Sequence, residues 1–376
     1  MISLPQRRAD AYPSSTRVEA GPLGTLAKTA SDRVCDRFAL QAAARDLLPF
    51  ERVAHCLRTP RAGAVEVLHV PGRRSGVFKG LQTCGSVWHD AVCQAKISER
   101  RRVELSEAME RSRAEGWRFF LASYTVRHQR ADDLVLVLAG LKDARRRHRS
   151  GAWSEAARAV VAASVRALEV THGVNGWHPH LHDILGVAPG VEFDEGELAR
   201  DLGERWAVSA DQAARKVGVD LAVNGHGFKL TRDQEAIADY VTKLGRPSTW
   251  SLAHEVTKQV VKRGRVEGSR TPTDLLWLFL AGDDDAGRLW QVYAYVFKGQ
   301  NQLVWSPGGR VLLGLGVEKS DDELAAEVSE QAVLMALLTL PEWRVILGND
   351  LRAELLTVAG RGVRAEVLEW VTRVTK

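Results

Sequence analysis

Hydrophobic and polar positions follow two different periods along the chain, and the changes of period predict an order of elements. Partial alternation in Ala64–Val70, followed by the turn residues Gly72–Gly76, is typical of a strand that enters a hairpin. Helical spacing over 95–116 ends at a glycine, which suits a helix C-terminus. The β-rich run Trp117–Val126 then predicts a strand inside a sheet.

A second hairpin is the clearest local prediction. Ser164–Thr171 and Trp177–Leu185 both have strand patterns, and the segment Gly173–Gly176 between them has the residues of a tight turn. Helices are expected over four further segments: 134–149, 152–163, 195–217 and 234–243. From about residue 271 the pattern is mostly helical, and 321–376 is expected to be a helical appendage.

These elements predict an α+β protein in four parts. Residues 1–35 are rich in Pro, Ser, Arg and Gly and lack periodicity, so a mobile tail is expected there. A segment with Cys and His over 36–110, a sheet-containing core over 111–270 and a mostly helical region over 271–376 follow. A hydrophobic content of 45% with 26% charged residues excludes a disordered or fibrous chain as the main interpretation.

The net charge and the lengths of the apolar runs limit which partners and which cellular location are expected. The formal net charge is +5 with a pI of about 9.1, which is compatible with nucleic-acid binding. The longest apolar runs, Leu275–Gly282 and Ala332–Leu340, are shorter than the ~20 residues of a membrane-spanning helix. The N-terminus has no continuous apolar stretch of the secretory type, so a cytoplasmic location without membrane contact is expected.

Three of the eleven histidines, His178, His180 and His182, stand at every second position of one predicted strand. Alternation of side chains along a strand turns all three to the same face of the sheet. Imidazoles so arranged can hold one divalent cation, and Glu169 on the partner strand of the hairpin is the expected oxygen ligand. The alternative is a solvent-facing strand that happens to carry histidines, and three within five residues disfavour it.

The predicted helix at 234–243 has a second chemical signal, Tyr240 and Lys243 three residues apart on one helical face. A phenol attacks a phosphodiester only when its proton is removed and the phosphate charge is neutralised. Taken alone, such a pair carries little weight. Next to a histidine metal strand it becomes informative.

In order along the chain, these motifs resemble those of the HUH endonucleases, specifically the rolling-circle replication initiators (Rep proteins) of small plasmids from Gram-positive bacteria. The resemblance rests on the strand Phe119–Thr125, on His180-Leu-His182 and on Tyr240-Val-Thr-Lys243. It extends to Trp177-His-Pro-His, to Cys84-Gly-Ser and to Leu303-Val-Trp-Ser-Pro-Gly, and it covers roughly residues 50–320.

The resemblance implies an HUH-type antiparallel sheet core and a nicking reaction at a plasmid double-strand origin that is single-stranded or cruciform at the nick. Tyr240 is then the nucleophile that becomes joined to the DNA 5′ end, and His180 and His182 bind Mg²⁺ or Mn²⁺. Lys243 matches the lysine expected to orient or neutralise phosphate. His178 lies outside the core motif and either supports the metal shell or contacts DNA.

One position departs from the resemblance. Relatives often have a glutamate four residues before the tyrosine, as the base that ends the cycle, and this chain has Ala236 there. That base is left unassigned. A host helicase is an open candidate partner, and the oligomeric state is not predicted.

Relatives also carry cysteines ahead of the first motif. Here Cys56, Cys84, His89 and Cys93 are expected to form a structural Cys₃His zinc site, because clustered cysteines in a reducing compartment are metal ligands more often than disulfides. The alternative is a set of small buried thiols in an apolar core. Cys35 is either free or a replacement for Cys56.

Three basic clusters are candidate phosphate contacts: Arg100–Arg102, Arg145–Arg149 and Lys258–Arg265. The last is preferred because it follows the tyrosine helix, and its predicted DNA-binding residues are Lys258, Lys262, Arg263 and Arg265. Two other functions stay open. One is an HUH transposase, which would use the same residues on different DNA, and the other is a non-catalytic zinc-containing DNA-binding regulator.

Overall fold

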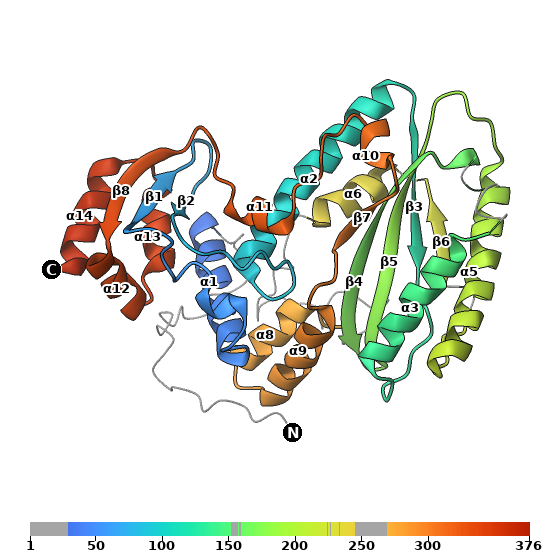
Figure 1. The fold of residues 1–376 in the computed structure, drawn as a ribbon, viewed down its shortest axis with the longest axis horizontal. Coiled ribbons are helices and arrows are strands. Elements are labelled where there is room, and N and C mark those ends of the chain that lie inside the picture. Colours follow the sequence, from blue (N-terminus) through green and yellow to red (C-terminus); the bar gives the residue numbers. More distant parts are fainter. Residues whose placement is uncertain are drawn as a thin grey trace, which may run out of the picture.

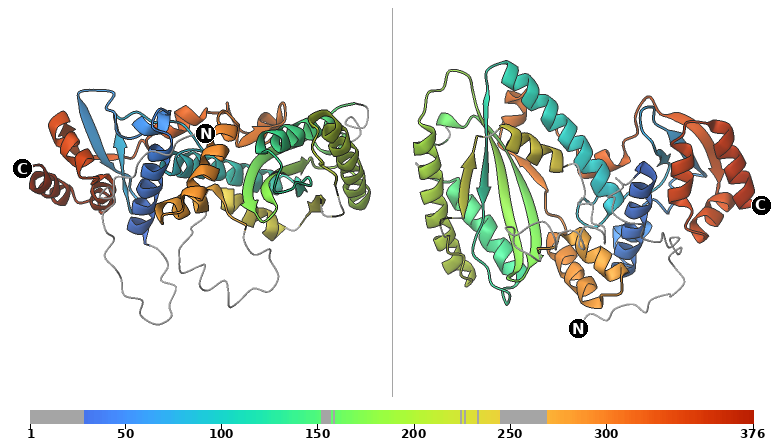
Figure 2. Two further views of the ribbon diagram at one scale, coloured as in Figure 1. Left: turned by 90° about the horizontal axis from the view of Figure 1, so that it is seen from below. Right: turned by 180° about the vertical axis from the view of Figure 1, so that it is seen from behind.

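The computed structural model describes residues 29–151, 157, 159–223, 225, 227–232, 234–244 and 269–376. Within these residues the protein is of the predicted α+β class, with helices and two antiparallel sheets. The two sheets lie toward opposite ends of the molecule, with helices between them (Figures 1 and 2). No helix in this part of the chain combines the length and the apolar character needed to cross a bilayer.

The larger sheet has the histidine strand at its centre, in the order β6-β3-β5-β4-β7. Its strands are β3 (Arg118–Tyr124), β4 (Ala163–Gly173), β5 (Gly176–Val187), β6 (Phe228–Thr231) and β7 (Leu303–Trp305). Strands β4 and β5 form the predicted hairpin, with Gly173 opposite Gly176. Gly176 has a φ of 82°, and a Cβ there would lie 3.0 Å from the Cα of Arg130, so both backbone and space favour glycine.

Different helices cover the two faces of this sheet (Figure 1). One face packs on α3 (Leu134–His148) and α5 (Glu195–Val217), where Trp206 is buried beneath β3. The other packs on α2 (Ala91–Ala114) and α6 (Gln234–Leu244). Because β5 alternates, its apolar residues divide between the two cores, which gives the strand two distinct environments.

The smaller sheet joins the two ends of the chain. Its order is β2-β1-β8, formed by β1 (Ala64–His69), β2 (Gly76–Lys79) and β8 (Val333–Thr339). Strand β8 is the exception to the helical expectation for 321–376. Periodicity alone does not separate a short apolar run of this kind from a helix, and its pairing with β1 decides its conformation.

Helices complete both regions. Around the smaller sheet lie α12 (Leu340–Gly348), α13 (Arg352–Ala359) and α14 (Arg364–Thr375). The remaining helices are α1 (Ala30–Leu47), the short 3₁₀ helix η1 (Arg52–His55), α8 (Pro272–Leu280), α9 (Asp284–Phe297), α10 (Gly309–Leu312) and α11 (Asp321–Ala326). Helix α1 begins inside the 1–35 segment, because Thr29 and Asp32 form a capping box.

Candidate functional site

The β4–β5 hairpin brings Glu169, His180 and His182 together. Its register sets Glu169 directly opposite His180. The Oε2 of Glu169 lies 3.3 Å from the Nε2 of His180 and 3.9 Å from the Nε2 of His182. One ligand atom from each residue falls within 4.8 Å of the other two. Two imidazole nitrogens and a carboxylate oxygen that converge in this way suit a divalent cation.

Hydrogen bonds at the far nitrogen of each ring orient the two histidines. The Nδ1 of His180 lies 3.1 Å from the carbonyl oxygen of His178, and the Nδ1 of His182 lies 2.9 Å from the Oγ of Ser123. A neutral imidazole that donates through Nδ1 keeps its lone pair on Nε2. In that form each Nε2 would face Glu169 with its lone pair free for a metal.

The three side chains of the cluster shift one another's pKa. Burial alone would raise the pKa of Glu169, but hydrogen bonding to His180 and the two histidines' charges hold it at about 2. Burial lowers the pKa of His182 to about 4. Burial also acts to lower the pKa of His180, yet the Glu169 carboxylate outweighs it and the pKa is raised. The cluster thus offers an ionised carboxylate, with His182 neutral at neutral pH.

Tyr240 lies against this cluster. Helix α6 packs beneath the sheet through Ile237 and Val241, which turns Tyr240 toward β5. Its ring centroid is 4.7 Å from that of His182, and the residue is only 9% exposed. Its hydroxyl is buried beside the Glu169 carboxylate, without a hydrogen bond of ordinary geometry to a described residue. Burial and the nearby Glu169 carboxylate raise the pKa of the phenol well above its usual value.

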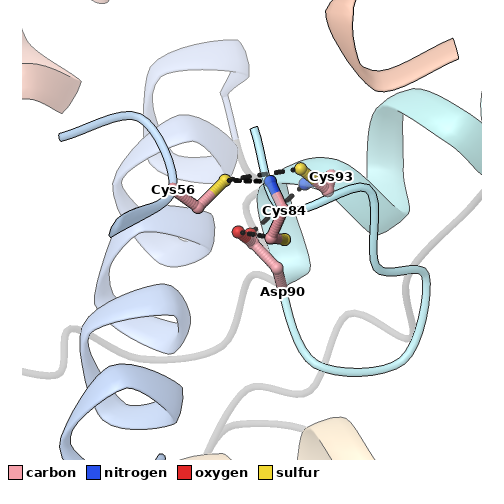
Figure 3. Close-up of side chains that lie close together, drawn as sticks. All are labelled: Cys56, Cys84, Asp90 and Cys93. Atoms are coloured by element: carbon pink, nitrogen blue, oxygen red, sulfur yellow. Dashed lines mark hydrogen bonds between the residues drawn. The ribbon is translucent and has the colours of Figure 1, made fainter. Parts of the chain in front are cut away.

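A second group of potential ligands surrounds the start of α2 (Figure 3). Cys56, Cys84 and Cys93 are buried and approach one another from three segments, with the Sγ atoms of Cys56 and Cys93 3.5 Å apart. Asp90 is the fourth member, and its Oδ2 lies 3.2 Å from the Sγ of Cys84. Three sulfurs and one oxygen form a donor set that tetrahedral zinc accepts.

The structure brings Asp90, not the predicted His89, to the three cysteines. The ring of His89 points elsewhere, with Nε2 2.8 Å from the carbonyl oxygen of Ala294. Asp90 caps α2 by accepting from the backbone N–H of Val92 at 2.8 Å, which fixes its carboxylate over the thiols.

Hydrogen bonds among the buried groups of the cysteine group shift their titration in opposite directions, and they raise the pKa of the Cys56 thiol. Hydrogen bonds from Cys56 and Cys84 lower the pKa of the Cys93 thiol. Burial raises the pKa of Asp90 to about 6. Cys35 is exposed on α1 and is not part of the group.

Two proteins of known name are similar to the chain. The first is "Protein rep" of Streptomyces lividans, which is 26% identical over 328 residues, or 70% of each chain. The second is "Neomycin resistance protein" of Streptomyces cyanogenus, 28% identical over 165 residues, or 37% of each chain. No protein-family model matches the chain, and no solved structure matches it.

The remaining predicted residues fall outside the two groups. His178 shares the strand face but lies beside His128, with their Nδ1 atoms 3.3 Å apart. Lys243 belongs to α6, and its side chain lies outside what the structure describes. The predicted DNA-binding residues Lys258, Lys262, Arg263 and Arg265 also lie outside the described residues.

Sequence reasoning missed Ser123 and His128. The alternation of β3 is the signal for Ser123, since it shares a strand face with Leu121, opposite Ala122 and Tyr124. Only the β3–β5 register, which sets Ser123 against His182, shows what that serine contacts. His128 follows β3 in a connecting segment, where no periodic pattern places it.

Proposed function

We propose that this chain initiates plasmid replication by nicking origin DNA through Tyr240, in a metal-dependent transesterification of the HUH type. The observation that carries the proposal is the burial of Tyr240 against the Glu169–His180–His182 group, with its ring beside that of His182. Similarity to "Protein rep" supports the replication role over 70% of the chain. The motif order along the sequence supports the same class.

The donor set fits a hard divalent cation, and Glu169, His180 and His182 would hold Mg²⁺ or Mn²⁺. Bound there, the ion would polarise the scissile phosphate and offset its charge. His178 is a neighbour of the His180 ring at a centroid distance of 5.0 Å, and we assign it a supporting or DNA-contacting role.

The covalent step is a phosphoryl exchange. The Oη of Tyr240 forms a bond to phosphorus while the bond from phosphorus to the DNA 3′ oxygen breaks. The phenol proton leaves to a base, and the released 3′ oxygen takes up a proton to become the free hydroxyl that primes synthesis. Burial raises the pKa of the phenol well above its usual value, so a base must take the proton for attack to occur.

Other residues would bind DNA around this step. Lys243, one helical turn beyond Tyr240, would neutralise phosphate charge. Lys258, Lys262, Arg263 and Arg265 are proposed contacts to the sugar–phosphate backbone. We assign the nuclease core to 111–270, preceded by the zinc segment over 36–110 and followed by the region 271–376.

We further infer that Cys56, Cys84, Cys93 and Asp90 bind a structural Zn²⁺. All four residues are buried, which leaves no open position for substrate. Such an ion would tie the η1 segment to the start of α2 and so brace the helix that packs on α6.

A covalent-adduct assay tests the nicking function. A labelled single-stranded oligonucleotide from the cognate plasmid's nick region is incubated with the protein and Mn²⁺ or Mg²⁺, then run on a denaturing gel. We expect a protein–DNA adduct that disappears in chelator and in Tyr240→Phe. The control Tyr295→Phe removes the hydroxyl of an exposed tyrosine and should leave the adduct intact.

Tight DNA binding without an adduct on any origin-derived strand would contradict nicking and favour the DNA-binding regulator. An adduct that forms on the DNA of a mobile element would favour the transposase, provided that the plasmid replicates without this protein. The same purified protein serves for both assays.

A further inference from the structure

A cavity of about 610 Å³ opens between α1, the β1–β2 hairpin and the first half of α2. These elements lie together beside the smaller sheet, away from the β4–β5 hairpin (Figure 1). Tyr240, Glu169 and the histidines do not line it. It is therefore separate from the proposed nicking centre.

The lining of this cavity is strongly cationic. Seven basic side chains contribute to it: Arg33, Arg37, Arg61, Arg73, Arg74, Lys79 and Lys96. Among the described lining residues Glu99 is the single acid, and it is held by two hydrogen bonds of 2.8 and 2.7 Å from Arg102. Lys79 pairs with Glu66 at 3.3 Å, and the other basic side chains leave the cavity with an excess of positive charge.

Four of these arginines have no partner in the described protein. Arg37, Arg61, Arg73 and Arg74 make no ion pair and no side-chain hydrogen bond with any described residue. Burial lowers the pKa of the Arg37 guanidinium, and the charges of neighbouring arginines lower it further. Cations gathered at a cavity whose single described acid is already hydrogen-bonded to Arg102 are arranged for an anion from outside.

The other basic clusters differ, which supports the interpretation that the cavity binds an anion. Arg100 and Arg101 pair with Glu327 and Asp321 at 3.3 and 2.7 Å. Arg145 pairs with the buried Asp183. These clusters are neutralised within the chain, so their charges serve the fold.

The interior of the cavity is apolar. Phe38, Phe78 and Leu81 line it together with several aliphatic side chains. Its volume is that of a pocket for a small molecule. A DNA duplex is too broad to enter, because its major groove alone is ~12 Å wide. An unpaired nucleotide combines an apolar base with flanking phosphates, and such bases bind apolar and aromatic surfaces beside cationic grooves.

We propose that this cavity binds single-stranded DNA, with phosphates on the arginine rim and a base directed to the apolar interior. The proposal rests on the proposed nicking function for its DNA substrate. Helix α2 links the two sites: Lys96 lines the cavity, and Met109 packs in the core that contains Tyr240. Thirteen residues of helix separate them, or ~20 Å at 1.5 Å per residue. The cavity would hold the strand at about that distance from the nick.

The test measures binding in the Tyr240→Phe chain, so that no cleavage occurs. Fluorescence anisotropy of a labelled oligothymidine is recorded against salt concentration for Arg73→Ala/Arg74→Ala. Both residues are exposed in the hairpin turn, so the fold should persist. The matched control, Arg344→Ala/Arg373→Ala, removes two exposed charges from α12 and α14 outside the cavity.

We expect the cavity variant to bind about tenfold more weakly and its slope of log K against log salt to fall by ~1.4, for two lost phosphate contacts. The control should stay within about twofold of the parent. Ultraviolet crosslinks of the parent should map to peptides within residues 33–99. Equal weakening in both variants would overturn the proposal, as would crosslinks confined to other segments. A duplex that competes as well as the single strand would overturn the single-strand assignment.

These outcomes are independent of nicking. A chain that binds the oligonucleotide through the arginines but forms no adduct would refute the nicking function alone. A chain that forms the Tyr240 adduct, yet whose cavity variant binds like the control, would refute the cavity proposal alone.

Discussion

Ser123 has the most specific supporting role at the scale of single residues. It lies opposite His182 across the β3–β5 ladder, and its hydroxyl is 2.9 Å from Nδ1 of that ring. Partners of this kind fix the tautomer and orientation of a ligating histidine. The next ring in contact is Tyr240, so a rotation of His182 would disturb both the proposed ligand and the nucleophile.

Ser123→Ala should therefore lower nicking by about 10- to 100-fold, as loss of such a partner typically does. We expect excess Mn²⁺ to restore part of the activity, because the lost contact acts on metal affinity. Initial rates of adduct formation across a Mn²⁺ titration provide the measurement. Ser123→Thr keeps the hydroxyl and is the matched control. An alanine variant with an unchanged metal requirement would show that the hydroxyl has no such role.

At the scale of elements, β5 carries different chemistry on its two faces. His180 and His182 face α6. Asp183 lies on the opposite face of the strand, where it is fully buried and pairs with Arg145 of α3. Arg145 also lies over the ring of Tyr124, with 5.2 Å to the centroid. Breaking a buried pair of this kind leaves an uncompensated charge and typically costs about 3–5 kcal/mol. The pair therefore links the histidine strand to α3.

His148 lies beside Arg145 in the same buried region, and its titration makes the stability of the fold depend on pH. Its Nε2 lies 3.1 Å from the carbonyl oxygen of Leu202 on α5, and its Nδ1 lies 3.3 Å from the Nη1 of Arg145. Burial lowers its pKa to about 3, and the charge of Arg145 contributes. The unfolded chain, with an ordinary histidine pKa near 6.5, binds this proton more readily. The stability that His148 contributes is thus complete above pH 6.5 and is lost as the pH falls toward 3.

His148→Gln should reduce the pH dependence of unfolding. Between pH 6.5 and 5 the wild type should lose about 1.4 kcal/mol per pH unit from this residue, or roughly 2 kcal/mol in all. The glutamine cannot bind the proton and should lack that loss. Urea denaturation at pH 7.5 and pH 5 measures the difference. His55→Gln, an exposed substitution, is the control and should follow the wild type. Identical pH profiles for His148→Gln and wild type would contradict the assignment.

At the scale of the whole molecule, the cysteine group lies beside a contact between α1 and α13, two helices far apart in the sequence. Arg352 from α13 donates to Gln41 of α1 at 2.9 Å, and Gln41 donates to Asp90 at 2.9 Å. Arg352, Gln41 and Asp90 are all buried. A metal on the three cysteines would therefore stabilise the junction between the smaller sheet and α2, which runs on to the proposed nicking centre.

We expect the wild type to carry one zinc ion per chain and Cys93→Ser to lose it. The melting temperature should fall with it, because an ion that binds only the folded state adds ~2.7 kcal/mol when free metal stands at a hundred times its Kd. Elemental analysis and thermal unfolding, each with and without chelator, provide the measurements. Cys35→Ser changes an exposed thiol and should keep the metal. A wild-type chain free of zinc, with thermal stability indifferent to chelator, would indicate buried thiols only.

Much of the larger sheet could be predicted because its determinants are local. The glycines of the β4–β5 turn and the alternation of its strands specify the hairpin within a few residues. Once that hairpin exists, side-chain alternation turns His180 and His182 to one face, and register brings Glu169 to them. Local spacing on α6 likewise assigned Tyr240 to a helix.

Tertiary structure alone decided the rest, because those features depend on contacts between distant segments. His89 and Asp90 are adjacent in sequence, and only the capping of α2 and the packing on α9 determine which of them meets the cysteines. Val333–Thr339 became a strand through its pairing with β1, more than 260 residues earlier. Runs of arginine look alike along the chain. Acids from other segments neutralise Arg100 and Arg101, while Arg73 and Arg74 meet no acid among the described residues, and this difference exists only in the folded protein.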